Sequence, residues 1–159
     1  MNAVPKPTKP IPIKKQCDAL WTACIYLRAG LRSELSGVSG ELNAKGTKIV
    51  GLNAHHIAHK PNNRLRFELE NGICLTVGEH GMGVHGSDPE TWRARLISKI
   101  GQDKWNWLHS LKSTNGKTDL HAVRLYLSQY LNAIVITAKV KFDRPELLKA
   151  YLKQIGVDP

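Results

Sequence analysis

The hydrophobic positions of this chain predict one helix near the N-terminus and several in the C-terminal half. Leu20, Cys24 and Leu27 recur at helical spacing between residues 15 and 29, and Gly30 is a typical residue to end that helix. Asp88 and Pro89 are a typical cap and first residue of another helix. The remaining pattern predicts helices over about residues 89–100, 104–111, 119–137 and 145–155.

Shorter apolar runs in the middle of the chain predict strands. Residues 41–42 and 48–57 are expected to be strands around the turn Asn43-Ala44-Lys45-Gly46. Two further strands are expected at residues 65–69 and 73–77, joined by the turn dipeptide Asn71-Gly72, and a polar loop is expected at residues 58–63. Strands enclosed by helices indicate an α+β fold.

Composition and charge narrow the class of protein. The chain has 159 residues, of which 42% are hydrophobic and 23% charged, as expected for one globular domain. Its 23 Lys and Arg against 13 Asp and Glu give a net charge of +10, which favours a polyanionic partner, nucleic acid before an anionic membrane surface. The same charge can also serve solubility alone.

No targeting or crosslinking signal appears in the sequence. No run approaches the ~20 apolar residues of a membrane span, and residues 1–7 lack the apolar stretch of a secretory signal. The three cysteines are not arranged as a disulfide framework. We therefore expect a cytoplasmic protein.

Two adjacent histidines, His55 and His56, are the main candidates for chemistry. Neighbouring residues of a strand point to opposite faces, so one imidazole can bind a metal while the other acts on a water molecule. The downstream Asn71 and His80 add further candidates, although an Asn-Gly turn alone would also select Asn71. The pattern indicates a metal-dependent enzyme.

The central segment resembles the HNH endonucleases, the ββα-metal (His-Me finger) nucleases. The resemblance is carried by Asn53-Ala54-His55-His56-Ile57, by the stretch LRFELENGICL at residues 65–75 and by Glu79-His80, and it covers roughly residues 15–85. The segment resembles phage-type HNH proteins linked to DNA recombination and packaging, which implies the cytosol of a bacterial or phage-infected host cell. The resemblance implies a ββα-metal core flanked by an N-terminal helix and a helical C-terminal half.

The resemblance also implies a role for each matching residue. His56 matches the general base that takes a proton from the attacking water, and Asn71 matches the structural Asn that orients this base. His55 and His80 match two metal ligands. His85 is the nearest candidate for a third ligand, or else an ordinary loop residue.

One divalent metal ion is the implied cofactor. Imidazole ligands suit Zn, Ni, Co or Mn, while Mg or Mn remains possible in function because phosphate and water complete the coordination shell. Many relatives also carry cysteine pairs that bind a structural zinc. At those places this chain has Ser36–Gly40 and Thr76–Glu79, so no structural zinc is expected, and Cys74 is expected to be a small buried residue.

Glycines are unusually frequent where the metal-bearing helix of the family should begin. Gly78, Gly81 and Gly83 each weaken a helix by about 1 kcal/mol relative to Ala. This helix is therefore expected to be short, or to begin only at Asp88. Stability in place of zinc is expected from the following helices, through the tryptophans 92, 105 and 107.

Basic residues flank the expected site. Lys60, Arg64 and Arg66 precede Asn71 and Arg93 lies on the next helix, so DNA phosphates are expected partners, although each is individually compatible with solvation alone. Residues 1–14 predict a flexible Pro/Lys-rich arm, residues 15–112 the nuclease domain with its following helices, and residues 113–159 a helical extension packed on the same domain.

The sequence thus predicts a metal-dependent HNH endonuclease that hydrolyses DNA phosphodiester bonds, by nicking or by structure-selective cleavage. The oligomeric state is open, and a dimer would be needed to cut both strands with one site per chain. The alternative is a catalytically decayed HNH-fold protein that only binds DNA.

Overall fold

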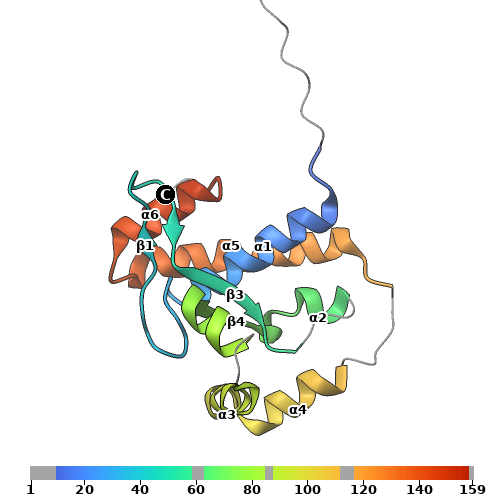
Figure 1. Cartoon of the computed structure of the whole chain (residues 1–159). Coiled ribbons are helices and arrows are strands. Elements are labelled where there is room, and N and C mark those ends of the chain that lie inside the picture. Colours follow the sequence, from blue (N-terminus) through green and yellow to red (C-terminus); the bar gives the residue numbers. More distant parts are fainter. Residues whose placement is uncertain (1–9, 59–62, 85–87, 112–116, 158–159) are drawn as a thin grey trace, which may run out of the picture.

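The computed structural model describes residues 10–58, 63–84, 88–111 and 117–157 and has a mixed α+β fold (Figure 1). Six α-helices, four short strands and two short helical turns follow one another along the described chain. Their bounds are α1 Ile13–Arg28, β1 Glu41–Leu42, β2 Ile49–Val50, β3 Leu52–His56, α2 Asn63–Phe67, η1 Leu69–Asn71, β4 Gly72–Thr76, η2 Glu79–Val84, α3 Pro89–Ile100, α4 Gln102–Ser110, α5 Leu120–Lys141 and α6 Pro145–Gln154.

The strands form two separate antiparallel pairs. β1 pairs with β2, and β3 pairs with β4 in a register that sets His55 opposite Ile73 and His56 opposite Gly72. The predicted strand at 48–57 is therefore two strands, because Gly51 has a φ of +84° and turns the chain between β2 and β3. The β3–β4 pair therefore sets the backbone positions of His55 and His56.

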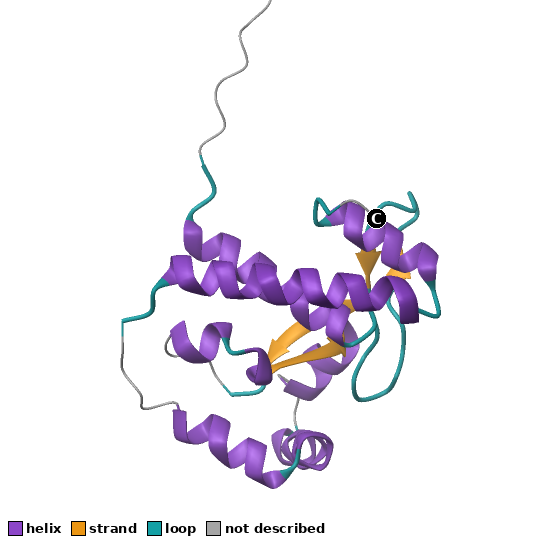
Figure 2. Ribbon diagram, turned by 180° about the vertical axis from the view of Figure 1, so that it is seen from behind, coloured by secondary structure: helices purple, strands orange, loops and turns teal. Residues whose placement is uncertain are grey.

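A first hydrophobic core joins the two ends of the chain. α5 lies along α1, and α6 closes the end of this helical pair (Figure 2). Leu127, Leu131 and Val135 of α5 pack in one cluster with Trp21 and Cys24 of α1. The C-terminal helices thus complete the core of the N-terminal helix. None of the helices in the described part of the chain has the length and apolar character that a membrane span needs.

A second core lies on the other face of β4. Ile73 and Leu75 contact Trp92 of α3 and Leu108 of α4 within this cluster. Of the three tryptophans expected to stabilise the fold, Trp92 is buried and Trp105 partly buried. The expectation that Trp107 stabilises the fold was wrong, because its side chain is 42% exposed.

The strand predicted at residues 65–69 was wrong. Residues 63–67 form α2, and η1 follows at once. In a strand, Leu65, Phe67 and Leu69 would share one face. Here Leu65 enters the second core while Phe67 and Leu69 enter the first, and only a folded connection between β3 and β4 can divide them this way.

The turn predicted at Asn71-Gly72 was also wrong. Gly72 is extended (φ −100°, ψ 146°) and begins β4. A Cβ atom at this position would lie 2.2 Å from Ile25 Cδ1 and 2.9 Å from Trp21 Cζ2. Glycine is therefore required here for the close approach of α1 to β4, and a turn conformation plays no part.

The remaining predicted helices are present with shifted ends. Asp88 caps α3 by accepting a hydrogen bond from Thr91 N at 3.0 Å, and Gly101 ends the helix with a φ of +86°. The helix expected after β4 is short, as η2 spans only Glu79–Val84.

Candidate metal and general-base site

The two adjacent histidines of β3 have different neighbours because strand residues alternate between faces. His56 lies toward α1, where its ring stacks on Trp21 with centroids 3.9 Å apart and planes 6° apart. His55 contacts His80 of η2, with ring centroids 5.1 Å apart and planes 66° apart. The alternation therefore gives each imidazole its own environment.

The His55–His80 pair has the donor chemistry of a divalent metal site. Two half-buried imidazoles from different elements meet edge to face. Neutral imidazole nitrogens are good ligands for Zn, Ni, Co or Mn. Among the described residues no group of three His, Cys, Asp or Glu side chains gathers around one point. His85, the candidate third ligand, lies outside the described residues.

His56 has a defined tautomer in its neutral form. Its Nε2 lies 2.8 Å from the carbonyl oxygen of Arg66. A carbonyl can only accept, so Nε2 must carry the proton and donate it. In the neutral imidazole the lone pair is then on Nδ1, which is the nitrogen able to take a proton from water.

Asn71 fixes the two ends of the connection after β3. Its side chain is fully buried, accepts a hydrogen bond from Ala58 N at 2.7 Å, and donates to Ala58 O at 3.1 Å and Leu65 O at 2.9 Å. Its own carbonyl accepts from Ile57 N at 2.8 Å. One amide thus holds the chain directly after His56 and directly before Arg66, the residue whose carbonyl binds that histidine.

Ser33, Thr76 and Glu79 form a hydrogen-bonded cluster, in the region where no structural zinc is expected. Thr76 and Glu79 form a capping box: Thr76 N donates to Glu79 Oε2 at 2.8 Å and Glu79 N donates to Thr76 Oγ1 at 3.0 Å. Ser33 Oγ donates to the same Glu79 oxygen at 2.7 Å. We call Ser33, Thr76 and Glu79 the clasp; it ties the loop after α1 to the residue that precedes His80.

Hydrogen bonding keeps the Glu79 carboxylate ionised. Burial alone would raise its pKa, but the hydrogen bonds from Ser33 and Thr76 hold the pKa below its usual range. The nearby Cys74 behaves differently. Burial raises the pKa of its thiol to about 12, so the thiolate that binds metals is scarce at neutral pH.

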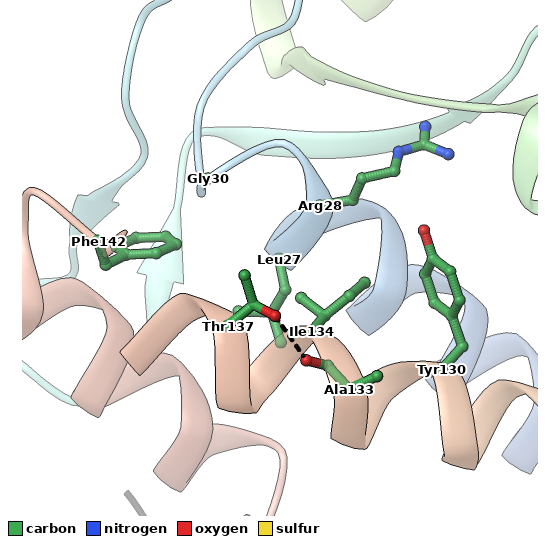
Figure 3. A pocket seen from close by; sticks show the side chains of 8 residues that line it. All are labelled: Leu27, Arg28, Gly30, Tyr130, Ala133, Ile134, Thr137 and Phe142. Atoms are coloured by element: carbon green, nitrogen blue, oxygen red, sulfur yellow. Dashed lines mark hydrogen bonds between the residues drawn. The ribbon is translucent and has the colours of Figure 1, made fainter. Parts of the chain in front are cut away.

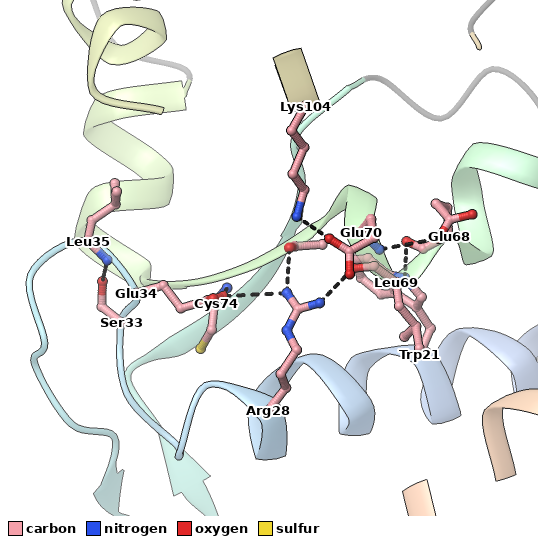
Figure 4. Close-up of polar contacts among 11 residues, drawn as sticks. Trp21, Arg28, Ser33, Glu34, Leu35, Glu68, Leu69, Glu70, Cys74 and Lys104 are labelled. Atoms are coloured by element: carbon pink, nitrogen blue, oxygen red, sulfur yellow. Dashed lines mark hydrogen bonds and ion pairs between the residues drawn. The ribbon is translucent and has the colours of Figure 1, made fainter. Parts of the chain in front are cut away.

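Arg28 connects α1 to the strand that faces it (Figure 4). Its guanidinium donates to the carbonyls of Leu69 at 2.9 Å and Gly72 at 2.8 Å, and lies 3.7 Å from the Glu34 carboxylate. Glu34 in turn accepts from Cys74 N at 2.8 Å. These contacts fix the helix against η1 and β4 next to His56.

The basic residues predicted to contact DNA are placed unevenly. Arg66 donates two hydrogen bonds to Asp18 of α1, at 2.6 and 2.7 Å. Arg93 is exposed on α3, with its guanidinium carbon 5.6 Å from the centre of the Trp105 ring. Lys60 and the side chain of Arg64 lie outside the described residues. Of the four, Arg66 thus has an internal partner and Arg93 faces solvent.

Three residues around the site were missed by sequence reasoning. Glu79 had an available signal, the capping box Thr76-Val77-Gly78-Glu79. Asp18 and Trp21 had none, because their partners Arg66 and His56 are more than thirty positions away.

An apolar hollow lies between α1 and α5 (Figure 3). Leu27, Ile134 and Phe142 line it, and its charged residue Arg28 directs its guanidinium to backbone carbonyls. This hollow therefore lacks the grouped polar side chains that the histidine site has.

Comparison of the chain with models of known protein families, with curated proteins and with solved structures finds no match. The functional interpretation therefore rests on the residues of the site and their geometry.

Proposed function

We propose that this protein is a divalent-metal-dependent HNH endonuclease that hydrolyses phosphodiester bonds of DNA, by nicking or structure-selective cleavage. The observation that carries the proposal is the placement of three histidines on β3 and on η2, the short helical turn that follows β4. His55 and His80 form a pair of donors, and His56 is held with Nε2 donating to a carbonyl. The positive net charge of +10 supports a nucleic acid as substrate.

His56 is the general base in this proposal. The Arg66 carbonyl keeps the proton on Nε2, so Nδ1 takes the proton of the attacking water. The water oxygen forms the new bond to phosphorus as the bond to the departing oxygen breaks. Asn71 keeps both chain segments around His56 in place while this happens.

His55 and His80 would hold the metal ion, functionally Mg or Mn. Such an ion supplies a positive charge next to the phosphate oxygens and the departing oxygen, where negative charge gathers in the transition state. The two imidazoles would bind the ion as neutral ligands.

Cleavage of supercoiled plasmid by the purified full chain, with Mn, Mg or a chelator, tests the proposal. We expect nicking that requires the metal and falls about 100- to 10,000-fold in His56→Ala, the range of a lost general base. His121→Ala, at an exposed position of α5, is the matched control and should cut like the wild type.

A folded His56→Ala variant that nicks at the wild-type rate would overturn this assignment. Salt-sensitive DNA binding by a wild-type chain that neither cleaves nor takes up Mn in a calorimetric titration would instead favour the decayed, DNA-binding alternative.

A further inference from the structure

The His56 imidazole lies against α1, on the side chain of Trp21. The Trp21 indole lies parallel to it, with planes 6° apart and centroids 3.9 Å apart. Trp21 is 3% exposed, and its Nε1 donates to the Glu68 carbonyl at 3.1 Å (Figure 4). This hydrogen bond prevents the indole from turning in its plane. The aromatic surface on which the imidazole stacks is therefore held in place.

A second contact from the same helix reaches the residue that binds His56 Nε2. Asp18 stands three residues before Trp21 and therefore on the same face of α1. Its two carboxylate oxygens accept from Arg66 Nε and an Arg66 terminal nitrogen, at 2.6 and 2.7 Å. The carbonyl of that same Arg66 accepts the proton of His56 Nε2. Asp18 thus holds the residue that decides the tautomer.

We propose that Asp18 and Trp21 are positioning residues for His56, with Trp21 setting the plane of the imidazole and Asp18, through Arg66, keeping the proton on Nε2. The catalytic consequence of these two roles rests on the proposed function, since proton abstraction by Nδ1 is the step that requires both a fixed ring plane and a fixed tautomer. Arg66 accordingly serves the base through its backbone, and its side chain anchors α2 to α1.

Both constraints are needed because an imidazole has two independent freedoms. It can rotate about the Cβ–Cγ bond, and its neutral form can carry the proton on either nitrogen. A flat aromatic surface limits the rotation and a fixed acceptor selects the tautomer. A general base displaced by about 1 Å loses up to about 100-fold in rate.

The test combines imidazole NMR with kinetics on the full chain. Nitrogen shifts report which nitrogen of His56 is protonated, and ring-proton shifts report the stacked indole through its ring current. The His56 signals are identified by their loss in His56→Gln. The variants are Trp21→Leu, which removes the flat surface, Trp21→Phe, which restores it without the Nε1 donor, and Asp18→Asn, which removes the charge that holds Arg66.

We expect Trp21→Leu to lose the ring-current shift and about 10- to 100-fold in kcat with KM nearly unchanged. Trp21→Phe should recover most of both. Asp18→Asn should give a mixture of tautomers and a smaller loss of kcat. The matched control is Trp105→Leu, because Trp105 stacks on His109 of α4 with centroids 4.1 Å apart. It should leave the His56 signals and kcat unchanged.

Unchanged His56 signals and kcat in folded Trp21→Leu and Asp18→Asn would overturn the proposal. If Trp21→Leu does not fold, Asp18→Asn decides alone, because Asp18 is partly exposed. A wild-type chain that does not cleave DNA contradicts the proposed function only. The NMR signals then decide: loss of the single tautomer in the variants supports the positioning roles, and identical signals overturn them.

Discussion

The two imidazoles of the candidate metal pair are held by different kinds of structure. His55 is part of β3, where the ladder to β4 sets its backbone and faces Ile73 across the pair. His80 belongs to a short helical turn that contains Gly81 and Gly83. The residue before it, Glu79, is held by the clasp. The ladder is made by backbone hydrogen bonds, whereas the clasp depends on three side chains. Changes in the clasp should therefore loosen the His80 side locally, whereas changes in the packing around β3 should destabilise the fold as a whole.

The largest effect is expected on the β3 side, from Asn71→Ala. This change removes three hydrogen bonds of a fully buried amide and leaves the partners Ala58 and Leu65 without it, which should cost about 3 kcal/mol of unfolding free energy. Urea denaturation measures this loss, and cleavage should fall with it because the loop next to His56 is released. Asn53→Ala, on β3, is the control. Equal midpoints for the two variants would show that Asn71 is dispensable.

Gly72→Ala should have the next largest effect. The added methyl group overlaps with Ile25 and Trp21, so α1 must shift and the fold should lose about 1–3 kcal/mol. Gly81→Ala is the control, because a Cβ atom there meets nothing within 4 Å. Thermal unfolding compares the two. If Gly72→Ala melts at or above the wild-type temperature, the close packing of α1 on β4 is not required.

Glu79→Gln tests the clasp directly. Weaker acceptance from Ser33 and Thr76 should cost roughly 1 kcal/mol and lower the affinity for Mn, since the residue before His80 is released. Calorimetric titration measures the affinity, with Glu41→Gln, at an exposed position of β1, as the control. Unchanged Mn affinity would mean that His80 is positioned without the clasp.

Acid should weaken the same region. The pKa of Glu79 is held below its usual range by hydrogen bonds, so its ionised form contributes stability above the ordinary glutamate pKa. That contribution is lost as the pH falls below about 4.5 and through the lower pKa of the folded state. Urea midpoints measured at pH 6 and pH 4 should therefore differ less in Glu79→Gln than in the wild type. An identical pH dependence in the two proteins would show that ionisation of Glu79 does not contribute to stability.

The smallest effect is expected at a partly exposed ion pair, from Lys104→Met. Lys104 of α4 forms an ion pair with Glu70, and its hydrogen bond lowers the pKa of that carboxyl. An exposed pair of this kind contributes up to about 0.5 kcal/mol. The unfolding midpoint should barely move, and a shift as large as that of Glu79→Gln would mean that this pair is part of the site's support.

Local sequence patterns predicted much of the fold because they depend on neighbours along the chain. Asp88 and Pro89 begin a helix, and Gly30, with a φ of +67°, follows the end of another. The alternation of β3 was enough to expect His55 and His56 on opposite faces. The same reasoning failed at residues 65–69, where an alternating pattern contributes to two cores instead of one sheet face.

By itself, the sequence determined five of the six described α-helices (all but α2), the β3 and β4 strands, and the histidines on β3 and after β4. The tertiary structure alone decided what surrounds those histidines. Trp21 and Asp18 meet His56 and Arg66 across long stretches of chain, and Gly72 is needed because α1 approaches β4 closely. Such contacts depend on how separate elements pack, and no pattern within a single element encodes them. The adjacent histidines are thus a property of the sequence, and their fixed geometry is a property of the fold.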